Sequence, residues 1–137
     1  MGTCLDFYIP GINGPGGGGP IIFSKRLKSE LEKYTNGEIY DVIVDLRKDS
    51  ISFGKWLAFE LSQDSNNSLI IPKGCAHGFQ VLEKDSHLLY IHSENWESSS
   101  ETGVVWNDEK LSIKWPLSAK NISTRDTSLP KLEFYEI

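Results

Sequence analysis

The sequence lacks the features that mark several specialised classes of protein. No apolar run approaches the roughly 18–20 residues that cross a bilayer, so no membrane partner is expected. The first residues lack the basic region and apolar stretch of a secretory signal, which indicates a cytoplasmic location. There are only two cysteines, Cys4 and Cys75, and their spacing fits no metal or redox motif. Two lone thiols suit a reducing compartment, where no disulfide is expected.

An excess of positive charge is also missing. The chain has 14 basic and 19 acidic residues, giving a formal net charge of −5, which argues against general nucleic-acid binding. An anionic ligand would therefore need a local basic pocket. What is present is the composition of one globular domain, since 137 residues with 39% hydrophobic and 24% charged side chains suit a single core.

Residues 1–36 differ in composition from the rest and are predicted to form an atypical N-terminal segment. The stretch "GINGPGGGGP" is rich in glycine and proline and is typical of a loop. Gly14 to Gly19 formally matches G-x-G-x-x-G, but a dinucleotide-binding loop also requires alternating strands and helices. Residues 24–34 are the only helix candidate, so a plain loop is favoured over a nucleotide loop.

From Gly37 onward the pattern is one of short strands. In "EIYDVIVDLR" the residues Tyr40, Val42, Val44 and Leu46 alternate with Asp41, Ile43, Asp45 and Arg47. Further strands are expected at "FGKWLAFELS", "LIIP", "GFQVLE" and "HLLYIHS". "WNDEKLSIKWPL" and "ISTRDTSLP" are expected to be ordered loops, with the tryptophans at 56, 106 and 115 packing or closing loops. The pattern predicts an all-β barrel or sandwich.

Five blocks carry a resemblance to a known family: "GEIYDVIVDLRKDSISFGKW", "LIIPKGCAHGF", "LLYIHSENW", "ETGVVWNDEKLSIKWP" and "STRD…LP". In this order and spacing they resemble the dTDP-4-dehydrorhamnose 3,5-epimerases of the cupin superfamily, over about residues 37–130. The resemblance implies an antiparallel jelly-roll barrel in residues 37–137, usually a homodimer, that needs no metal or organic cofactor. It also implies a nucleotide-sugar substrate, an NDP-4-keto-6-deoxyhexose.

The family reaction removes a proton next to the 4-keto group and returns one to the opposite face. Family members use a His held by an Asp as the base, a Tyr as the acid and a Lys near the keto oxygen. By resemblance, Tyr90 matches that Tyr and Asp126 matches that Asp. The family's G-L-H-x-Q and Q-x-K-L-V motifs, which hold the His and the Lys, would fall near Pro20 and Glu30, and neither is present.

His77 has three possible roles. The stretch P-x-G-x-x-H resembles a metal-binding cupin motif, but Val81 stands where that motif has Asn, and the chain has no H-x-H pair. A metal site needs about three or four converging ligands, so a metal is not favoured. The favoured role is a place in the pocket, catalytic or supporting, with Asp41 from a facing strand fixing the imidazole tautomer. Structural packing stays open as the alternative.

The remaining candidates follow from their positions in the resemblance. His92 lies two residues after Tyr90, so both side chains should share one face of a strand, where His92 could supply an imidazole. Lys73 and Arg125 suit contact with a diphosphate, and Trp96 suits stacking near a nucleotide base. The alternatives are an edge or outward histidine for His92, a core aromatic for Tyr90, and simple loop closure for Asp126 and Arg125.

Two functions therefore stay open. One is a sugar-nucleotide epimerase in deoxysugar or surface-polysaccharide biosynthesis. The other is a non-catalytic cupin that descends from such enzymes and binds a nucleotide sugar or a partner protein. A truncated product without enzymatic function is a third possibility.

Overall fold

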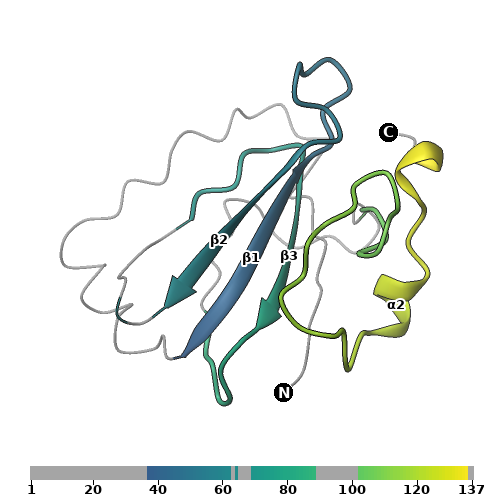
Figure 1. Cartoon of the computed structure of the whole chain (residues 1–137). Helices are drawn as coiled ribbons and strands as arrows, with labels where there is room; N and C mark the ends of the chain where they lie inside the picture. The colour runs from purple at the N-terminus through teal and green to yellow at the C-terminus, as the bar shows by residue number, and fades with distance from the viewer. Residues whose placement is uncertain (1–36, 63, 65–68, 89–101, 136–137) are drawn as a thin grey trace.

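The ordered part of the chain is built on one antiparallel sheet. The computed structural model describes residues 37–62, 64, 69–88 and 102–135. Its strands are β1 (Glu38–Asp45), β2 (Trp56–Ser62) and β3 (Cys75–Val81), in the spatial order β2-β1-β3 (Figure 1). Both neighbours run antiparallel to β1. The structure thus confirms a mostly β, antiparallel fold, while no closed barrel is seen among these residues.

The alternation in β1 produces the two faces that the sequence predicts. Val42 is paired with Ala58 and Gly78, and Val44 with Trp56 and Ala76. Side chains in register on neighbouring strands point to the same face, so these residues form one apolar layer. Val42, Val44 and the following Leu46 are completely buried. This layer is the core face of the sheet.

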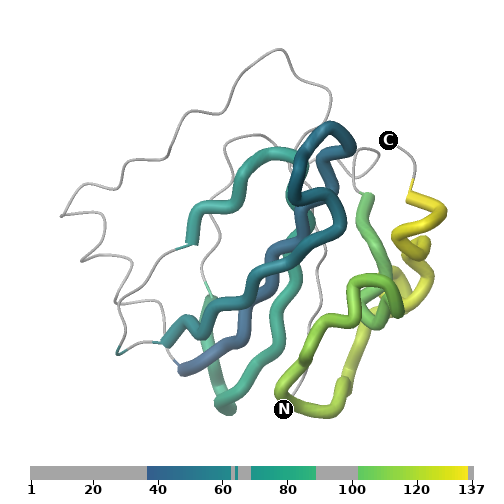
Figure 2. Tube along the Cα trace, turned by 45° about the horizontal axis from the view of Figure 1, so that its top comes forward, coloured from purple at the N-terminus to yellow at the C-terminus, as the bar shows by residue number. Residues whose placement is uncertain are grey.

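The segment 102–135 packs against the core face (Figure 2). Val104, Leu111 and Tyr135 join the buried cluster from this segment. It contains only two short helical turns, α2 (Thr124–Thr127) and η2 (Leu132–Phe134). The expected ordered loops are therefore confirmed, with a brief helical turn inside "ISTRDTSLP".

The tryptophans close these loops, as expected. The indole Nε1 of Trp56 donates to the carbonyl of Leu111 at 2.8 Å, and that of Trp115 donates to the carbonyl of Trp106 at 3.0 Å. All three indoles pack against the core. All three rings thus contribute apolar area, and those of Trp56 and Trp115 also satisfy a backbone acceptor.

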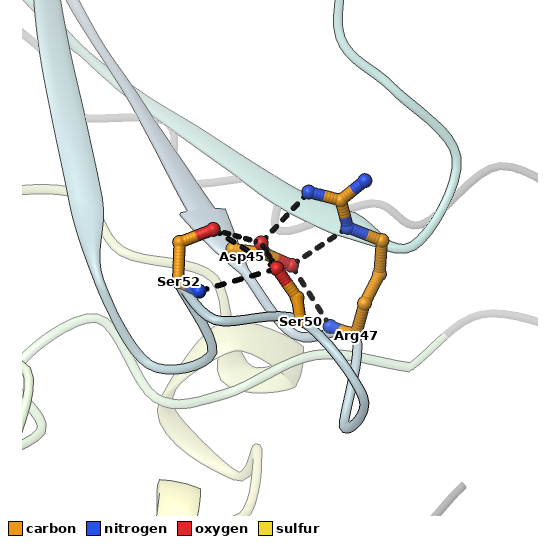
Figure 3. Close-up of polar contacts among 4 residues, drawn as sticks. All are labelled: Asp45, Arg47, Ser50 and Ser52. Atoms are coloured by element: carbon orange, nitrogen blue, oxygen red, sulfur yellow. Dashed lines mark hydrogen bonds and ion pairs between the residues drawn. The ribbon is translucent and has the colours of Figure 1, made fainter.

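A carboxylate organises the turn between β1 and β2 (Figure 3). The side chain of Asp45 accepts hydrogen bonds from the Ser50 and Ser52 hydroxyls, both at 2.6 Å. It also accepts from Arg47, through the backbone N–H at 3.0 Å, Nε at 2.9 Å and Nη2 at 2.7 Å. These bonds, above all those from the Arg47 side chain, hold the pKa of Asp45 far below its usual value. Gly54 completes the turn with a left-handed φ of 70°.

Two strand expectations were wrong in detail. "LIIP" forms no strand, because Pro72 and Lys73 open a turn that ends at Gly74, whose φ is +83°. The following strand starts at Cys75, where pairing with Asp45 begins, and ends at Val81, so it is shifted upstream of "GFQVLE". Most of the predicted strand "HLLYIHS" lies outside the described residues, as do the Gly-rich loop and residues 24–34. Within the described residues, no helix is long and apolar enough to cross a membrane.

Candidate functional site

The face of the sheet opposite the core carries a buried polar pair. Asp41 on β1 and His77 on β3 lie diagonally across adjacent strands, since Asp41 pairs with Phe79 and Ile43 with His77. His77 Nε2 and Asp41 Oδ2 are 2.8 Å apart. The two side chains are 6% and 3% exposed. The hydrogen bond expected between them is therefore present, although β1 is the adjacent strand rather than a facing one.

An apolar frame surrounds this pair. Two rows run across the sheet on this face: Leu57, Ile43 and His77 form one, and Phe59, Asp41 and Phe79 form the next. The Phe79 ring lies 6.1 Å from the His77 ring, between ring centroids. At the β2 side of the frame, Leu57 is 67% and Phe59 38% exposed. Towards β2, both rows therefore end in exposed apolar side chains.

The hydrogen bond to Asp41 bears on the tautomer of the His77 imidazole. A carboxylate only accepts hydrogen bonds, so Nε2 of His77 carries the proton that it donates to Asp41. In the neutral imidazole the lone pair then lies on Nδ1. Chemically, such an arrangement suits proton transfer, because a buried carboxylate holds the tautomer of the imidazole.

The second oxygen of this carboxylate is unusual. Asp41 Oδ1 is buried and has no hydrogen-bond partner among the residues that the structure describes. A buried polar atom without a partner costs about 1–3 kcal/mol, and more when it carries charge. Such atoms are rare in folded proteins and mark places where a functional explanation should be sought.

Asp126 and Arg125 lie on α2, in the segment that packs on the core face. Asp126 is fully buried, and its Oδ2 accepts from the Ser123 hydroxyl at 2.6 Å. Its Oδ1 accepts from Nε and Nη2 of Arg125 at 3.3 Å each. The Ser123 hydroxyl in turn caps the helical turn by accepting from the Asp126 backbone N–H. Both oxygens of Asp126 are therefore engaged by residues close in sequence.

Lys73 is exposed in the turn that precedes β3, four residues before His77. Beside it, Gly74 is packed against the stem of Arg47, since a Cβ at Gly74 would lie 2.6 Å from Arg47 Cγ. Cys75 follows, and burial raises the pKa of its thiol, which makes a reactive thiolate unfavourable. Lys73 and Arg125 are thus on separate parts of the chain, the turn before β3 and the helical turn α2.

Sequence reasoning missed two polar residues that hold the segment 102–135 in place. Gln80, completely buried on β3, donates to the carbonyl of Leu117 and accepts from its N–H, both at 2.9 Å. Asp108 accepts from the backbone N–H groups of Lys110, Leu111 and Leu132 at 2.8–3.0 Å. The Asn-Asp pair in "WNDEK" is a turn signal that points to Asp108. Nothing in the sequence singled out Gln80.

Three predicted site residues, Tyr90, His92 and Trp96, lie outside the described residues, so their roles stay predictions. No group of three or more His, Cys, Asp or Glu side chains capable of holding a metal occurs in the part of the chain that the structure describes.

Known proteins are similar to this chain in sequence and in structure. The family model for dTDP-4-dehydrorhamnose 3,5-epimerase matches residues 23–133, so the match begins upstream of residue 37. The curated enzyme of that name from Salmonella typhimurium is 38% identical over 110 residues, which cover 80% of this chain and 60% of that protein. The one from Escherichia coli is 40% identical over 107 residues, covering 77% and 58%. The chain thus spans about 60% of the length of these relatives.

Solved structures agree with this match. The epimerase from Legionella pneumophila, in complex with dTDP-4-keto-L-rhamnose, has a TM-score of 0.67 and 34% identity over 74% of this chain and 55% of its own. The Bacillus anthracis enzyme, with TDP and pyrophosphate bound, has a TM-score of 0.61 and 40% identity over 71% of this chain and 55% of its own. With its sheet, its sequence blocks and these matches, the chain belongs to the dTDP-4-dehydrorhamnose 3,5-epimerase family.

Proposed function

We propose that this chain acts on a dTDP-linked 4-keto-6-deoxyhexose and moves a proton at a carbon next to the ketone. The observation that carries the proposal is the buried hydrogen bond between His77 and Asp41, in a chain of this family. The ligands named for the solved relatives, dTDP-4-keto-L-rhamnose and TDP, support the nucleotide and the sugar class.

In the proposed reaction, the imidazole of His77 accepts the proton from the carbon next to the ketone. The electron pair of the broken C–H bond moves into the carbonyl, which becomes an enolate. A second group then protonates the same carbon from the opposite face, and Tyr90 is predicted for this step from its sequence position. The imidazolium and the phenolate return to their starting states by proton exchange with water, so the cycle consumes no co-reactant.

Deuterium exchange tests the reaction. Incubation of the whole chain with dTDP-4-keto-6-deoxyglucose in D₂O should introduce deuterium at C3 or C5, observed by NMR. His77→Asn should slow this exchange by about 10²–10⁴-fold, the range expected for a lost general base. The matched control is His87→Asn, because His87 is the exposed histidine of the described residues. Equal exchange rates in wild type and His77→Asn contradict the assignment of the base.

A second candidate is nucleotide-sugar binding without turnover. It is favoured by Asp126, the residue that by resemblance should orient the catalytic histidine. Both of its oxygens bond locally, to Ser123 and Arg125. The chain also contains three histidines, and none precedes His77. Binding of a dTDP-sugar by calorimetry, with no deuterium exchange, would support this candidate.

We further propose that the sheet is one wall of a jelly-roll barrel and that two chains form a homodimer. β2 has a described neighbour on one side only, and small β proteins cover such edges. A single monomeric species in sedimentation at micromolar concentration would contradict the dimer. A circular-dichroism spectrum dominated by helix would contradict the barrel.

A further inference from the structure

Large apolar side chains are exposed where the β1–β2 turn meets η2. Ile51 in the turn is 96% exposed, Phe53 is 36% exposed, and Phe134 on η2 is 67% exposed. The turn and η2 lie next to each other, because a Cβ placed at Gly54 would be 3.2 Å from Leu132 Cδ2. Both lie towards the same end of the sheet (Figure 1). Ile51, Phe53 and Phe134 are called the apolar tip from here on.

The turn holds Ile51 away from the core. The hydroxyls of its two neighbours, Ser50 and Ser52, both donate to the buried Asp45 carboxylate at 2.6 Å. The Phe53 N–H donates to the Ser50 carbonyl at 3.0 Å and closes the chain around Ile51. The turn cannot bury Ile51 without breaking these bonds, so its exposure is imposed by the fold.

The surroundings of the apolar tip carry positive charge. Three exposed lysines lie in the turn, at its end and before η2: Lys48, Lys55 and Lys131. Two of the nearby acids are already paired, Asp45 with Arg47 at 2.7 Å and Glu133 with Lys110 at 3.1 Å. Asp49 is exposed and offsets only part of the lysine charge. The local charge is therefore positive, in a chain whose net charge is −5.

We propose that the apolar tip docks on the surface of a bilayer that contains anionic lipids. Apolar side chains enter the boundary between headgroups and acyl chains, while lysines around them are attracted to anionic headgroups. Peptides bind along grooves or sheet edges, whereas this turn protrudes from the end of the sheet (Figure 1). The lack of a spanning run predicted no membrane partner, but docking on the surface needs no span.

Co-sedimentation of the whole chain with lipid vesicles tests the inference. One set of vesicles is phosphatidylcholine alone, and the other is equal parts of phosphatidylcholine and phosphatidylglycerol. The chain should bind the mixed vesicles at least about tenfold more tightly, because each lysine near an anionic surface contributes about fivefold in affinity. Added salt should weaken this binding, since it screens exposed charges.

Substitutions in the apolar tip should weaken binding to the mixed vesicles. Ile51→Ser and Phe134→Ser should each do so about tenfold, because each removes apolar area that would leave water. Lys55→Gln should do so about fivefold.

Matched controls lie towards the other end of the sheet. Leu117 is 43% exposed and bonds to Gln80, which pairs with Tyr40 near the start of β1, whereas the turn follows the end of β1. Lys84 is exposed and follows β3. Leu117→Ser and Lys84→Gln should bind the mixed vesicles as wild type does.

Several results would overturn the inference. They are equal binding to both vesicle types, binding to neither, and an equal loss in the control variants. A fourth is unchanged vesicle binding in Ile51→Ser and Phe134→Ser together with a shift from dimer to monomer in sedimentation, because the apolar tip then joins two copies of the chain. None of these results bears on the proposed function, which deuterium exchange tests separately.

Discussion

The substitution Asp45→Ala tests whether one carboxylate holds the β1–β2 turn together. Asp45 is 7% exposed and accepts five hydrogen bonds, from the backbone and side chain of Arg47 and from the hydroxyls of Ser50 and Ser52. The substitution removes the acceptor and leaves two hydroxyls and an amide to find other partners. The turn keeps its backbone hydrogen bonds, among them those from Gly54 N–H to the Asp45 carbonyl and from Lys55 N–H to the Ser52 carbonyl, so the loss should come from the side-chain network.

The expected loss of stability follows from the groups that donate hydrogen bonds to Asp45. Each hydrogen bond to a charged group contributes about 1.5–3 kcal/mol, but these contributions are not additive. The Arg47 side chain is 48% exposed, so water screens its hydrogen bonds and they contribute little to the free energy of unfolding. Ser50 and Ser52 can keep the 3.0 Å hydrogen bond that their hydroxyls already share. We therefore expect Asp45→Ala to lower the free energy of unfolding by about 2–4 kcal/mol.

Urea unfolding followed by tryptophan fluorescence measures this loss, since Trp56 begins the strand after the turn. Asp45→Asn should lie between wild type and Asp45→Ala, because the amide keeps the shape and one acceptor. Asp49→Ala is the control, an exposed carboxylate on the same turn, and should change stability by less than about 0.5 kcal/mol. A loss in Asp45→Ala as small as that of the control would refute the reasoning.

The same carboxylate predicts a pH dependence. The Arg47 side chain and the two serine hydroxyls lower the pKa of Asp45 in the folded state below its unfolded value of about 3.9. Its contribution to stability is therefore complete above about pH 4 and is lost as the pH falls below that value. The stability difference between wild type and Asp45→Asn should narrow on acidification in that range. A difference that stays constant down to pH 2 would contradict the assignment.

Two further substitutions test other parts of the described structure. Asp108→Ala should destabilise the chain by about 2 kcal/mol, because three backbone N–H groups lose their acceptor, whereas exposed Glu109→Ala should have little effect in the same urea titration. Gly37→Ala should lower the free energy of unfolding by about 1–3 kcal/mol, because φ at this position is +88° and the new Cβ would lie 2.7 Å from Ser86 Cα. An unchanged thermal stability would contradict this, because it would show that the backbone just before β1 is less constrained than the structure indicates.

Local patterns were enough to predict much of the sheet. The alternation in "EIYDVIVDLR" correctly separated Val42 and Val44 from Asp41, because a strand sends successive side chains to opposite faces. The same rule failed at "LIIP", where apolar residues suggested a strand but the Pro72 turn took its place. Short apolar runs are ambiguous by pattern alone, and here Leu69 and Ile71 are only half-buried while Ile70 is 55% exposed.

For the site, the sequence by itself determined the family and proposed the site residues. The order and spacing of the five sequence blocks can be read without any knowledge of contacts. It also suggested that Asp41 and His77 interact. Only the tertiary structure decided that Asp41 uses one oxygen for His77 and keeps the other buried without a described partner. It likewise decided that Asp126 is engaged by Ser123 and Arg125. Hydrogen bonds depend on distances of a few tenths of an ångström between side chains, and that precision comes from strand register and packing, which no local pattern contains.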